Sequence, residues 1–210
     1  MSRVYGWILL GLLLLAGGLG AWLWASSGEP AAGPSAGPSS SPSPVPPAFS
    51  VEVTLRRVKA IPVRGSVKAR KLRAPAEEVR QTFTDLYAAA FVDPARWDGG
   101  AFPGIFGHFA PAARAEARQH LDELTLGRAN EYVSAVRPEW ARLDVRFLLG
   151  PARVPVAAQA SMRFAATAFN DDGVEVPIRH RGDYMLERLE GRWLVTSYRV
   201  NGGFGPEAVR

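Results

Sequence analysis

The first hydrophobic pattern along the chain is a long uncharged run at its N-terminus. No charged residue occurs in the 22 residues from Val4 to Ala25. As a helix, a run of this length spans about 33 Å, which matches a hydrocarbon core of about 30 Å. Aromatic rings, which favour the headgroup region, stand near both ends of the run: Tyr5, Trp7, Trp22 and Trp24. The pattern predicts a transmembrane anchor within residues 1–25.

Two later stretches place apolar residues at helical spacing. The first begins at Pro75, where proline and the following acidic residues suit an initial turn, and ends before Pro94. Its apolar stripe contains Val79, Phe83, Leu86, Tyr87, Ala90 and Phe91. The second runs from Pro111 to about Leu126. We therefore expect two successive helices.

The hydrophobic period changes to two from about Tyr132, as in half-buried strands. A shorter alternation also starts at Val51. The later pattern predicts strands joined by hairpins: one ending at Leu149, one over Val154–Ala166, one from Val174 to about Leu189 with breaks near Pro177 and Gly182, and one over Arg192–Asn201. Helices followed by hairpins indicate an α+β domain, with the helices packed in a curved antiparallel sheet.

Composition separates the anchor from this domain. Residues 26–47 contain seven prolines among Gly, Ala and Ser, which favours extended polyproline II over a packed core. Fully extended, this segment reaches about 70 Å. We interpret it as a flexible linker. The remaining divisions are a basic connector or strand at 48–74, the α+β domain at 75–201 and a tail at 202–210.

Positive charge is concentrated directly before the domain. The chain has a formal net charge of +5, and Val51–Ala74 holds eight basic residues and one acid. Two interpretations remain open: a solvated strand and connector, or a surface attracted to anionic lipid headgroups or to an acidic partner. The second would use Arg56, Arg57, Lys59, Arg64, Lys68, Arg70, Lys71 and Arg73.

The flanking charges predict the orientation of the anchor. Arg3 precedes the span, and the next basic residue is Arg56. The positive-inside rule therefore places the N-terminus in the cytoplasm and the domain outside the cytoplasmic membrane. The alternative is a cleaved signal peptide, whose apolar region should be only about 7–15 residues with a small-x-small site. The longer run here, with bulky Trp24 beside Ala25, favours a retained single-pass anchor.

The end of the chain carries a family resemblance. After two helices and a meander, the last hairpin reads Gly191-Arg-Trp193-Leu-Val195. Over roughly residues 74–201 this order resembles the nuclear transport factor 2-like superfamily, whose last hairpin commonly carries a Gly-x-Trp-x-Val pattern. With its anchor and linker, the chain is similar to membrane-anchored members, such as mammalian-cell-entry-associated proteins and inner-membrane assembly factors of type IV secretion. The resemblance implies a cone-shaped domain with a ligand cavity and often a homodimer. It does not fix the function, because such folds host both enzymes and scaffolds.

Aromatic residues are the candidates for lining such a cavity. They are Tyr87, Phe91, Trp97, Phe102, Phe106, Trp140, Phe164 and Tyr184. The glycine-rich segment from Trp97 to Phe109 has two interpretations, a lid over the cavity or a set of rings that plugs its open end.

Residues suited to catalysis are few. The absence of cysteine excludes disulfides, thiolate nucleophiles and cysteine-ligated zinc. His108, His120 and His180 stand alone in the sequence and are expected at the surface. The chain has no HExxH, phosphate loop or nucleophile elbow, so we assign no catalytic residue and expect no metal or cofactor. The basic segment lacks interleaved aromatics, which disfavours nucleic acid.

Together these patterns predict a non-enzymatic extracytoplasmic binding or assembly domain, tethered to the cytoplasmic membrane. Its partners would be the lipid bilayer and other proteins of an envelope, transport or secretion complex. The alternative is a small-molecule-binding or enzymatic cavity of the same fold. A histidine or carboxylate pointing into the base of the cavity would favour that alternative.

Overall fold

The computed structural model describes residues 49–55, 69–150 and 152–204, which all belong to one compact unit. The predicted anchor, the linker and most of the basic segment lie outside the described residues. Within the described part, no helix is both long and apolar enough to cross a membrane.

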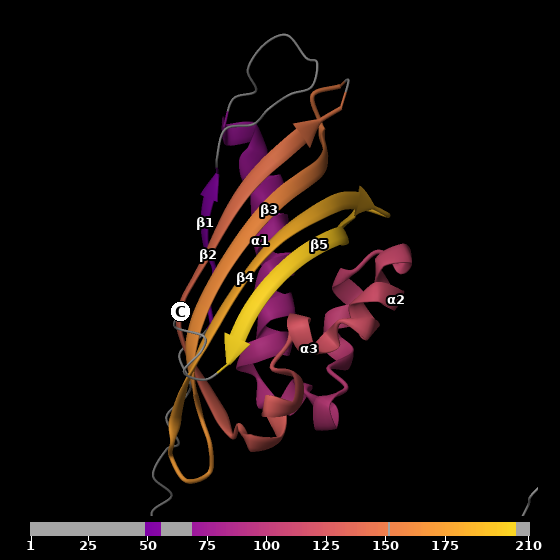
Figure 1. The fold of residues 1–210 in the computed structure, drawn as a ribbon. Helices are drawn as coiled ribbons and strands as arrows, with labels where there is room; N and C mark the ends of the chain where they lie inside the picture. Colours follow the sequence, from indigo (N-terminus) through magenta and orange to yellow (C-terminus); the bar gives the residue numbers. More distant parts are fainter. Residues whose placement is uncertain (1–48, 56–68, 151, 205–210) are drawn as a thin grey trace, which may run out of the picture. The chain divides into compact units, whose positions relative to one another are not determined.

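The sheet has five strands in the order β1-β2-β3-β4-β5. Its strands are β1 (Glu52–Leu55), β2 (Ala135–Leu149), β3 (Pro155–Phe169), β4 (Glu175–Leu189) and β5 (Arg192–Phe204). The last four form the predicted antiparallel meander, which curves strongly (Figure 1). The prediction of a wholly antiparallel sheet was wrong, because β1 pairs in parallel with β2. All the described helices lie between these two strands in the chain, and a parallel pair requires such a long crossover.

The main helix is α1 (Arg73–Tyr87), which continues into a π-helical turn, η2 (Ala88–Val92). The predicted second helix is broken at His120, where φ is −107° and ψ is 31°. Its two parts are α2 (Pro111–Gln119) and α3 (Leu121–Leu124). The short 3-10 turns are η1 (Ala69–Leu72), η3 (Pro94–Arg96), η4 (Asp98–Gly100), η5 (Pro103–His108) and η6 (Gly127–Tyr132).

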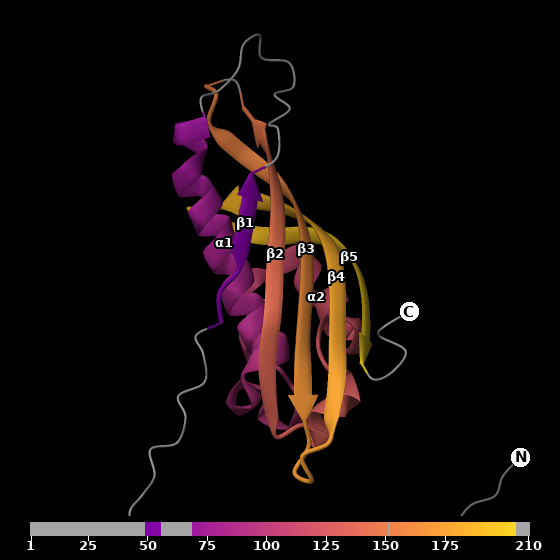
Figure 2. The same cartoon turned by 90° about the vertical axis from the view of Figure 1, so that its left-hand side faces the viewer.

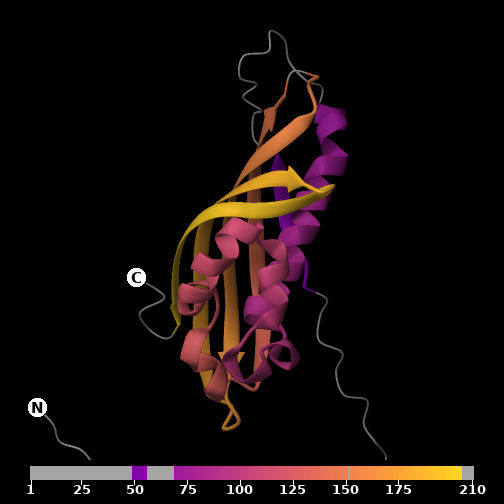
Figure 3. The same cartoon turned by 90° about the vertical axis from the view of Figure 1, so that its right-hand side faces the viewer.

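The helices cover only one face of the sheet. Viewed from the sheet side, the strands lie in front and the helices behind them (Figure 2). The opposite view shows α1 and α2 inside the curve, with the β4–β5 hairpin bending over them (Figure 3). Among the described residues, the outer face of the sheet carries no helix. The fold is therefore α+β, as predicted.

The core lies between α1 and the inner face of the sheet. Val79 and Phe83 of α1 are fully buried, as the apolar stripe predicted. Leu143, Val145 and Phe147 of β2 point to the same core, in alternation with charged residues that are exposed or partly exposed. Removal of this apolar surface from water is the main force that holds the helices to the sheet.

Two strand predictions differ from the structure. β4 runs without a break through Pro177 and Gly182. Pro177 lies beyond Ile178, the last β4 residue that pairs with β5 among the described residues. At such an edge the missing N–H of Pro177 is tolerated. β5 continues past Asn201 to Phe204, because Gly202 still pairs with His180, so the predicted tail begins too early.

Candidate functional site

A cavity of about 320 Å³ lies on the inner side of the sheet, where β4 and β5 meet the segment around α3. The cavity wall combines apolar side chains with acidic, basic and amide groups. Its residues are Phe91, Asp122, Glu123, Thr125, Leu126, Ile178, Arg179, His180, Val200, Asn201, Gly202 and Phe204.

Behind the cavity wall, three buried side chains form one hydrogen-bonded cluster. The Tyr87 hydroxyl lies 2.8 Å from Nδ1 of His180 and 3.1 Å from the hydroxyl of Tyr184. Tyr87, His180 and Tyr184 are 1%, 4% and 2% exposed. Tyr87 comes from the apolar stripe of α1, whereas His180 and Tyr184 share the inner face of β4. The fold therefore unites groups that are 93 or more positions apart in the chain.

The backbone fixes the direction of these hydrogen bonds. Nε2 of His180 lies 3.2 Å from the carbonyl oxygen of Glu123, which can only accept a hydrogen bond. Nε2 must therefore carry the proton, and Nδ1 of the neutral ring accepts from the Tyr87 hydroxyl. The Tyr87 oxygen in turn accepts from Tyr184. Both ring nitrogens of His180 are thus engaged.

Burial keeps the whole cluster uncharged near neutral pH. Loss of solvation lowers the pKa of His180 to about 4, and the hydrogen bond to the Glu123 carbonyl only partly offsets this effect. Burial also raises the pKa of the Tyr87 hydroxyl well above its usual value, and the pKa of Tyr184 shifts in the same direction. None of the three groups titrates between pH 6 and pH 8.

Two strand glycines make room for these rings. A Cβ atom at Gly182 would lie 2.4 Å from Cε2 of Tyr184, and one at Gly202 would lie 2.7 Å from Cδ2 of His180. Both distances are far below contact distance, so side chains at these positions would displace the rings. Glycine inside a strand often marks such a close approach. These glycines are the sequence signal that could have indicated the cluster, although the prediction for Gly182 was only a strand break.

Four of the predicted cavity residues lie together around the buried cluster: Tyr87, Phe91, Phe164 and Tyr184. The Phe164 ring centroid lies 5.5 Å from the centroids of both Tyr87 and Phe91. Tyr184 joins them through its hydrogen bond to Tyr87. Of these four, only Phe91 lines the cavity directly. Its ring centroid lies 4.7 Å from that of His180, with the two rings tilted relative to each other.

The other predicted residues lie elsewhere. Trp97 and Phe102 are buried against each other, with centroids 5.9 Å apart, and do not line the cavity. Phe106 is half-buried beneath the guanidinium of Arg118, 4.9 Å from its ring centre. These rings belong to the core and its edge, so the lid interpretation is not supported. Trp140 is 41% exposed and lies on the outer face, because a β-bulge beside Pro138 changes which residues point inward.

The prediction of surface histidines was wrong for His180. It occupies an inner-face position of β4 between Ile178 and Gly182. His108 and His120 are half-buried. A second hollow, of about 530 Å³, includes His108 and Asp85, and its Glu78 is already bound to Arg188 and Trp193. In the described part of the chain, no three His, Asp or Glu side chains are grouped as a metal site requires.

Comparisons with known proteins add little to this geometry. No family model matches the chain, and no curated protein matches it. Among solved structures, the chain is similar to a candidate aromatic ring hydroxylase from Novosphingobium aromaticivorans DSM, with 12% identity over 64% of this chain and 95% of that chain and a TM-score of 0.40. It is also similar to a candidate calcium/calmodulin dependent protein kinase II association domain from Xanthomonas campestris, with 12% identity over 69% and 93% and a TM-score of 0.33. Likeness at this level assigns neither a family nor an activity.

Proposed function

We propose that this chain is a non-enzymatic binding and assembly domain of nuclear transport factor 2-like fold. In this proposal, the N-terminal anchor holds the domain outside the cytoplasmic membrane as part of an envelope, transport or secretion complex. Two helical segments enclosed by a curved antiparallel meander support the fold. The observation that carries the function is the chemistry of the outer face of the sheet.

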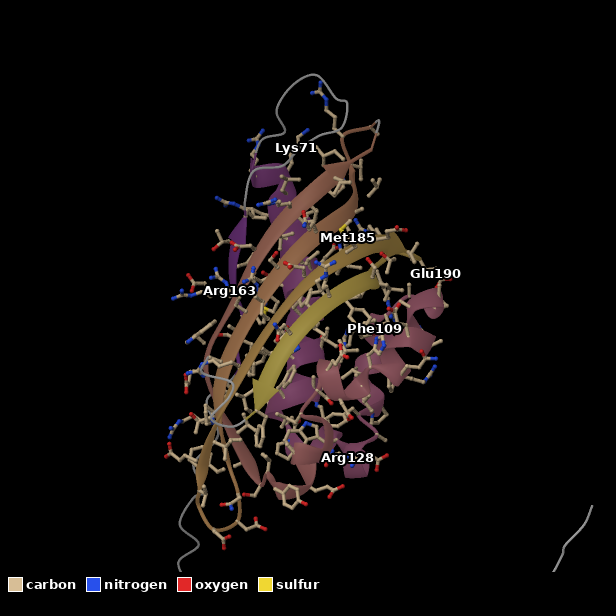
Figure 4. The ribbon with its side chains drawn as sticks, in the orientation of Figure 1. Lys71, Phe109, Arg128, Arg163, Met185 and Glu190 are labelled. Carbon is tan, nitrogen blue, oxygen red and sulfur yellow. The ribbon has the colours of Figure 1, made fainter. Side chains whose placement is uncertain are left out.

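The outer face exposes the residue types that dominate protein interfaces. Trp140 is 41% exposed, and the guanidinium of Arg142 lies 5.5 Å from its ring centre. Arg142, Arg163 and Arg181 are directly opposite one another on three neighbouring strands. Arg163 extends away from the sheet (Figure 4). Tryptophan and arginine are the residues most enriched at binding hot spots.

Part of the positive charge on this face is paired with acids. Arg142 lies 3.9 Å from Glu52, and Arg163 lies 3.7 Å from Asp144. These exposed pairs contribute little stability. The arginines and acids place both signs of charge near Trp140. Such a pattern suits a partner with complementary charges better than a polymer that carries one sign of charge.

The interior supports binding over catalysis. A general base needs a free lone pair and a pKa near the working pH. Nδ1 of His180 accepts from Tyr87, Nε2 donates to Glu123, and the pKa of the ring is lowered to about 4. Both ring nitrogens of His180 are therefore already hydrogen-bonded, and neither is available to a substrate.

The test is site-specific cross-linking in native membranes. A photoreactive amino acid replaces Trp140, and a matched control replaces Arg128, which is exposed on η6 away from the outer face. We expect discrete adducts with envelope proteins from position 140 and none from position 128. Adducts only with the chain itself would identify a homodimer, which the family resemblance implies. If no adduct forms at position 140, the assembly function is rejected.

The cavity beside His180 favours a second candidate, binding of a small polar molecule. Asp122, Arg179 and Asn201 give its wall polar groups. Native mass spectrometry of the chain purified from its own membranes would detect such a ligand. A mass excess that disappears in Val200→Trp, which fills the cavity, would establish this candidate. No excess in either protein would leave the cavity without a ligand role.

A further inference from the structure

The β2–β3 hairpin exposes two apolar side chains to solvent. Val154 is 51% exposed and Val156 is 50% exposed. The register passes from Leu148 opposite Ala157 to Leu149 opposite Pro155, so Val156 is the extra residue of a β-bulge. Its neighbours Leu149 and Pro155 are buried. The bulge thus exposes Val156, although the residues next to it are buried.

The hairpin turn holds these side chains in place. The N–H of Gly150 donates to the Val154 carbonyl at 2.9 Å, and the N–H of Arg153 donates to the Gly150 carbonyl at 2.9 Å. Val156 also lies close over Gly150, because a Cβ atom there would be 3.0 Å from Cγ1 of Val156. The two valines therefore form a fixed apolar tip.

Basic side chains surround the same end of the domain. The start of α1 and the β2–β3 hairpin lie at one end in all three ribbon views (Figures 1, 2 and 3). Lys71 is seen there beside the hairpin, whereas Arg128 lies at the opposite end (Figure 4). Arg70, Lys71 and Arg73 are exposed, and Leu72 between them is buried, which fixes the turn to the core.

The acids that follow this basic turn in the sequence are paired with other arginines. Glu77 pairs with Arg80, and Glu78 pairs with Arg188. Among the described residues, Arg70, Lys71 and Arg73 form no ion pair. Their positive charge is therefore available to an external anionic surface.

We infer that this tip, formed by Val154, Val156, Arg70, Lys71 and Arg73, docks on an anionic lipid bilayer. Exposed aliphatic side chains enter the boundary between headgroups and acyl chains, and basic side chains bind anionic headgroups. Exposed aliphatic side chains beside basic ones suit a bilayer, whose apolar layer lies directly beneath its anionic headgroups. The inference rests on the proposed membrane location and adds a second contact with the bilayer, apart from the anchor.

The test uses the full chain in vesicles with a single fluorescent label. The chain has no cysteine, so Ala152→Cys places one environment-sensitive dye at the turn between the strands without altering either valine. Arg128→Cys is the matched control label at the opposite end. Flotation of the vesicles reports membrane attachment, and the dye reports contact of the tip.

With anionic phosphatidylglycerol in the vesicles, we expect a blue shift and a gain of intensity at position 152. Pure phosphatidylcholine should give a much smaller response, and position 128 none. The response should be lost in Arg70→Gln/Lys71→Gln/Arg73→Gln and in Val154→Ser/Val156→Ser. It should persist in Arg96→Gln/Arg118→Gln/Arg128→Gln, which removes the same charge from exposed positions in the helical segments.

Each other outcome overturns a defined part of the proposal. Flotation without a dye response rejects the docking tip and leaves the anchor intact. No flotation in phosphatidylcholine rejects the anchor, and a response with anionic vesicles would then still support the tip. Equal responses in both lipids reject the role of charge and with it the inference. An equal response to polyglutamate, independent of the valines, would assign the tip to an acidic polypeptide instead.

Discussion

At the residue scale, Tyr87 joins the two halves of the buried cluster. Replacement by Phe removes the donor to Nδ1 of His180 and the acceptor for the Tyr184 hydroxyl. A buried polar group left without a partner costs about 1–3 kcal/mol. We expect Tyr87→Phe to lower the free energy of unfolding by about 2–4 kcal/mol, measured by urea titration of the full chain in detergent.

Tyr198 provides the matched control for this loss. It is half-buried, and its hydroxyl lies 3.4 Å from Nδ1 of His120, a long and weak hydrogen bond. Tyr198→Phe should therefore change stability by less than about 1 kcal/mol. Equal losses in the two variants would show that the cluster contributes no more than an ordinary hydrogen bond.

The lowered pKa of His180 predicts a specific pH dependence. Its pKa is about 4 in the folded chain against 6.5 for an unperturbed group. Between these values the unfolded state binds more protons, so stability should decrease as the pH falls from about 6.5 to about 4. The loss should total on the order of 3 kcal/mol and then level off.

His180→Gln removes this titration while keeping a polar side chain. The urea midpoint measured at several values between pH 7.5 and pH 4 should fall more steeply in the natural chain than in this variant. The difference between the two curves cancels the contribution of the carboxylates. Parallel curves would mean that His180 titrates near its usual pKa and is not desolvated.

Sequence reasoning identified the aromatic half of this cluster and missed the histidine for a physical reason. The helical spacing of Tyr87 and Phe91 defines a face without knowledge of any partner. The face of His180 depends on the register of β4. Two expected breaks, at Pro177 and Gly182, left that register undefined. Glycine at position 182 in fact accommodates the ring of Tyr184, a contact that exists only after folding.

At the element scale, β4 accommodates the ring of Tyr184 because Gly182 has no side chain. Gly182→Ala would place Cβ 2.4 Å from the Tyr184 ring, which must then move away from Tyr87. Overpacking of this kind costs about 1–3 kcal/mol. Gly107→Ala is the control, since nothing lies within 4 Å of its added Cβ. Thermal unfolding should separate the two variants by several degrees; a coincident pair of midpoints would show that the ring adapts freely.

Other elements show which parts of the fold the local sequence pattern can predict and which it cannot. The two-residue period predicted β2 to β5 and their turns, because alternation and turn chemistry are local properties. The parallel pairing of β1 with β2 joins segments about ninety positions apart in register, from Glu52 to Arg142, and has no local signal. The break at His120 separates α2 from α3, although the apolar spacing continues through it. There tertiary packing overrides helix propensity.

At the scale of the whole molecule, the described helices all lie on one side of the sheet and leave its other side without a helix. The interior holds an apolar core and a hydrogen-bonded polar cluster, beside a cavity of about 320 Å³. The outer face presents Trp140 and its arginines, and one end presents the apolar tip. The features available to partners are therefore peripheral, which agrees with a role in assembly at a membrane. This role depends on the N-terminal anchor, a prediction from residues 4–25.

That anchor gives the most decisive prediction for the whole chain. The uncharged run should keep the protein in the membrane pellet after alkaline carbonate extraction, with the N-terminus starting at Met1 or Ser2. Leu12→Arg/Leu14→Arg should release it, because each charge at the centre of a span costs about 2.5–3.5 kcal/mol. Protease added outside intact spheroplasts should digest the domain, whereas inverted vesicles should protect it. An N-terminus near Ser26 in the soluble fraction would mean that the run is a cleaved signal peptide, and the domain would then need its own tip to remain at the bilayer.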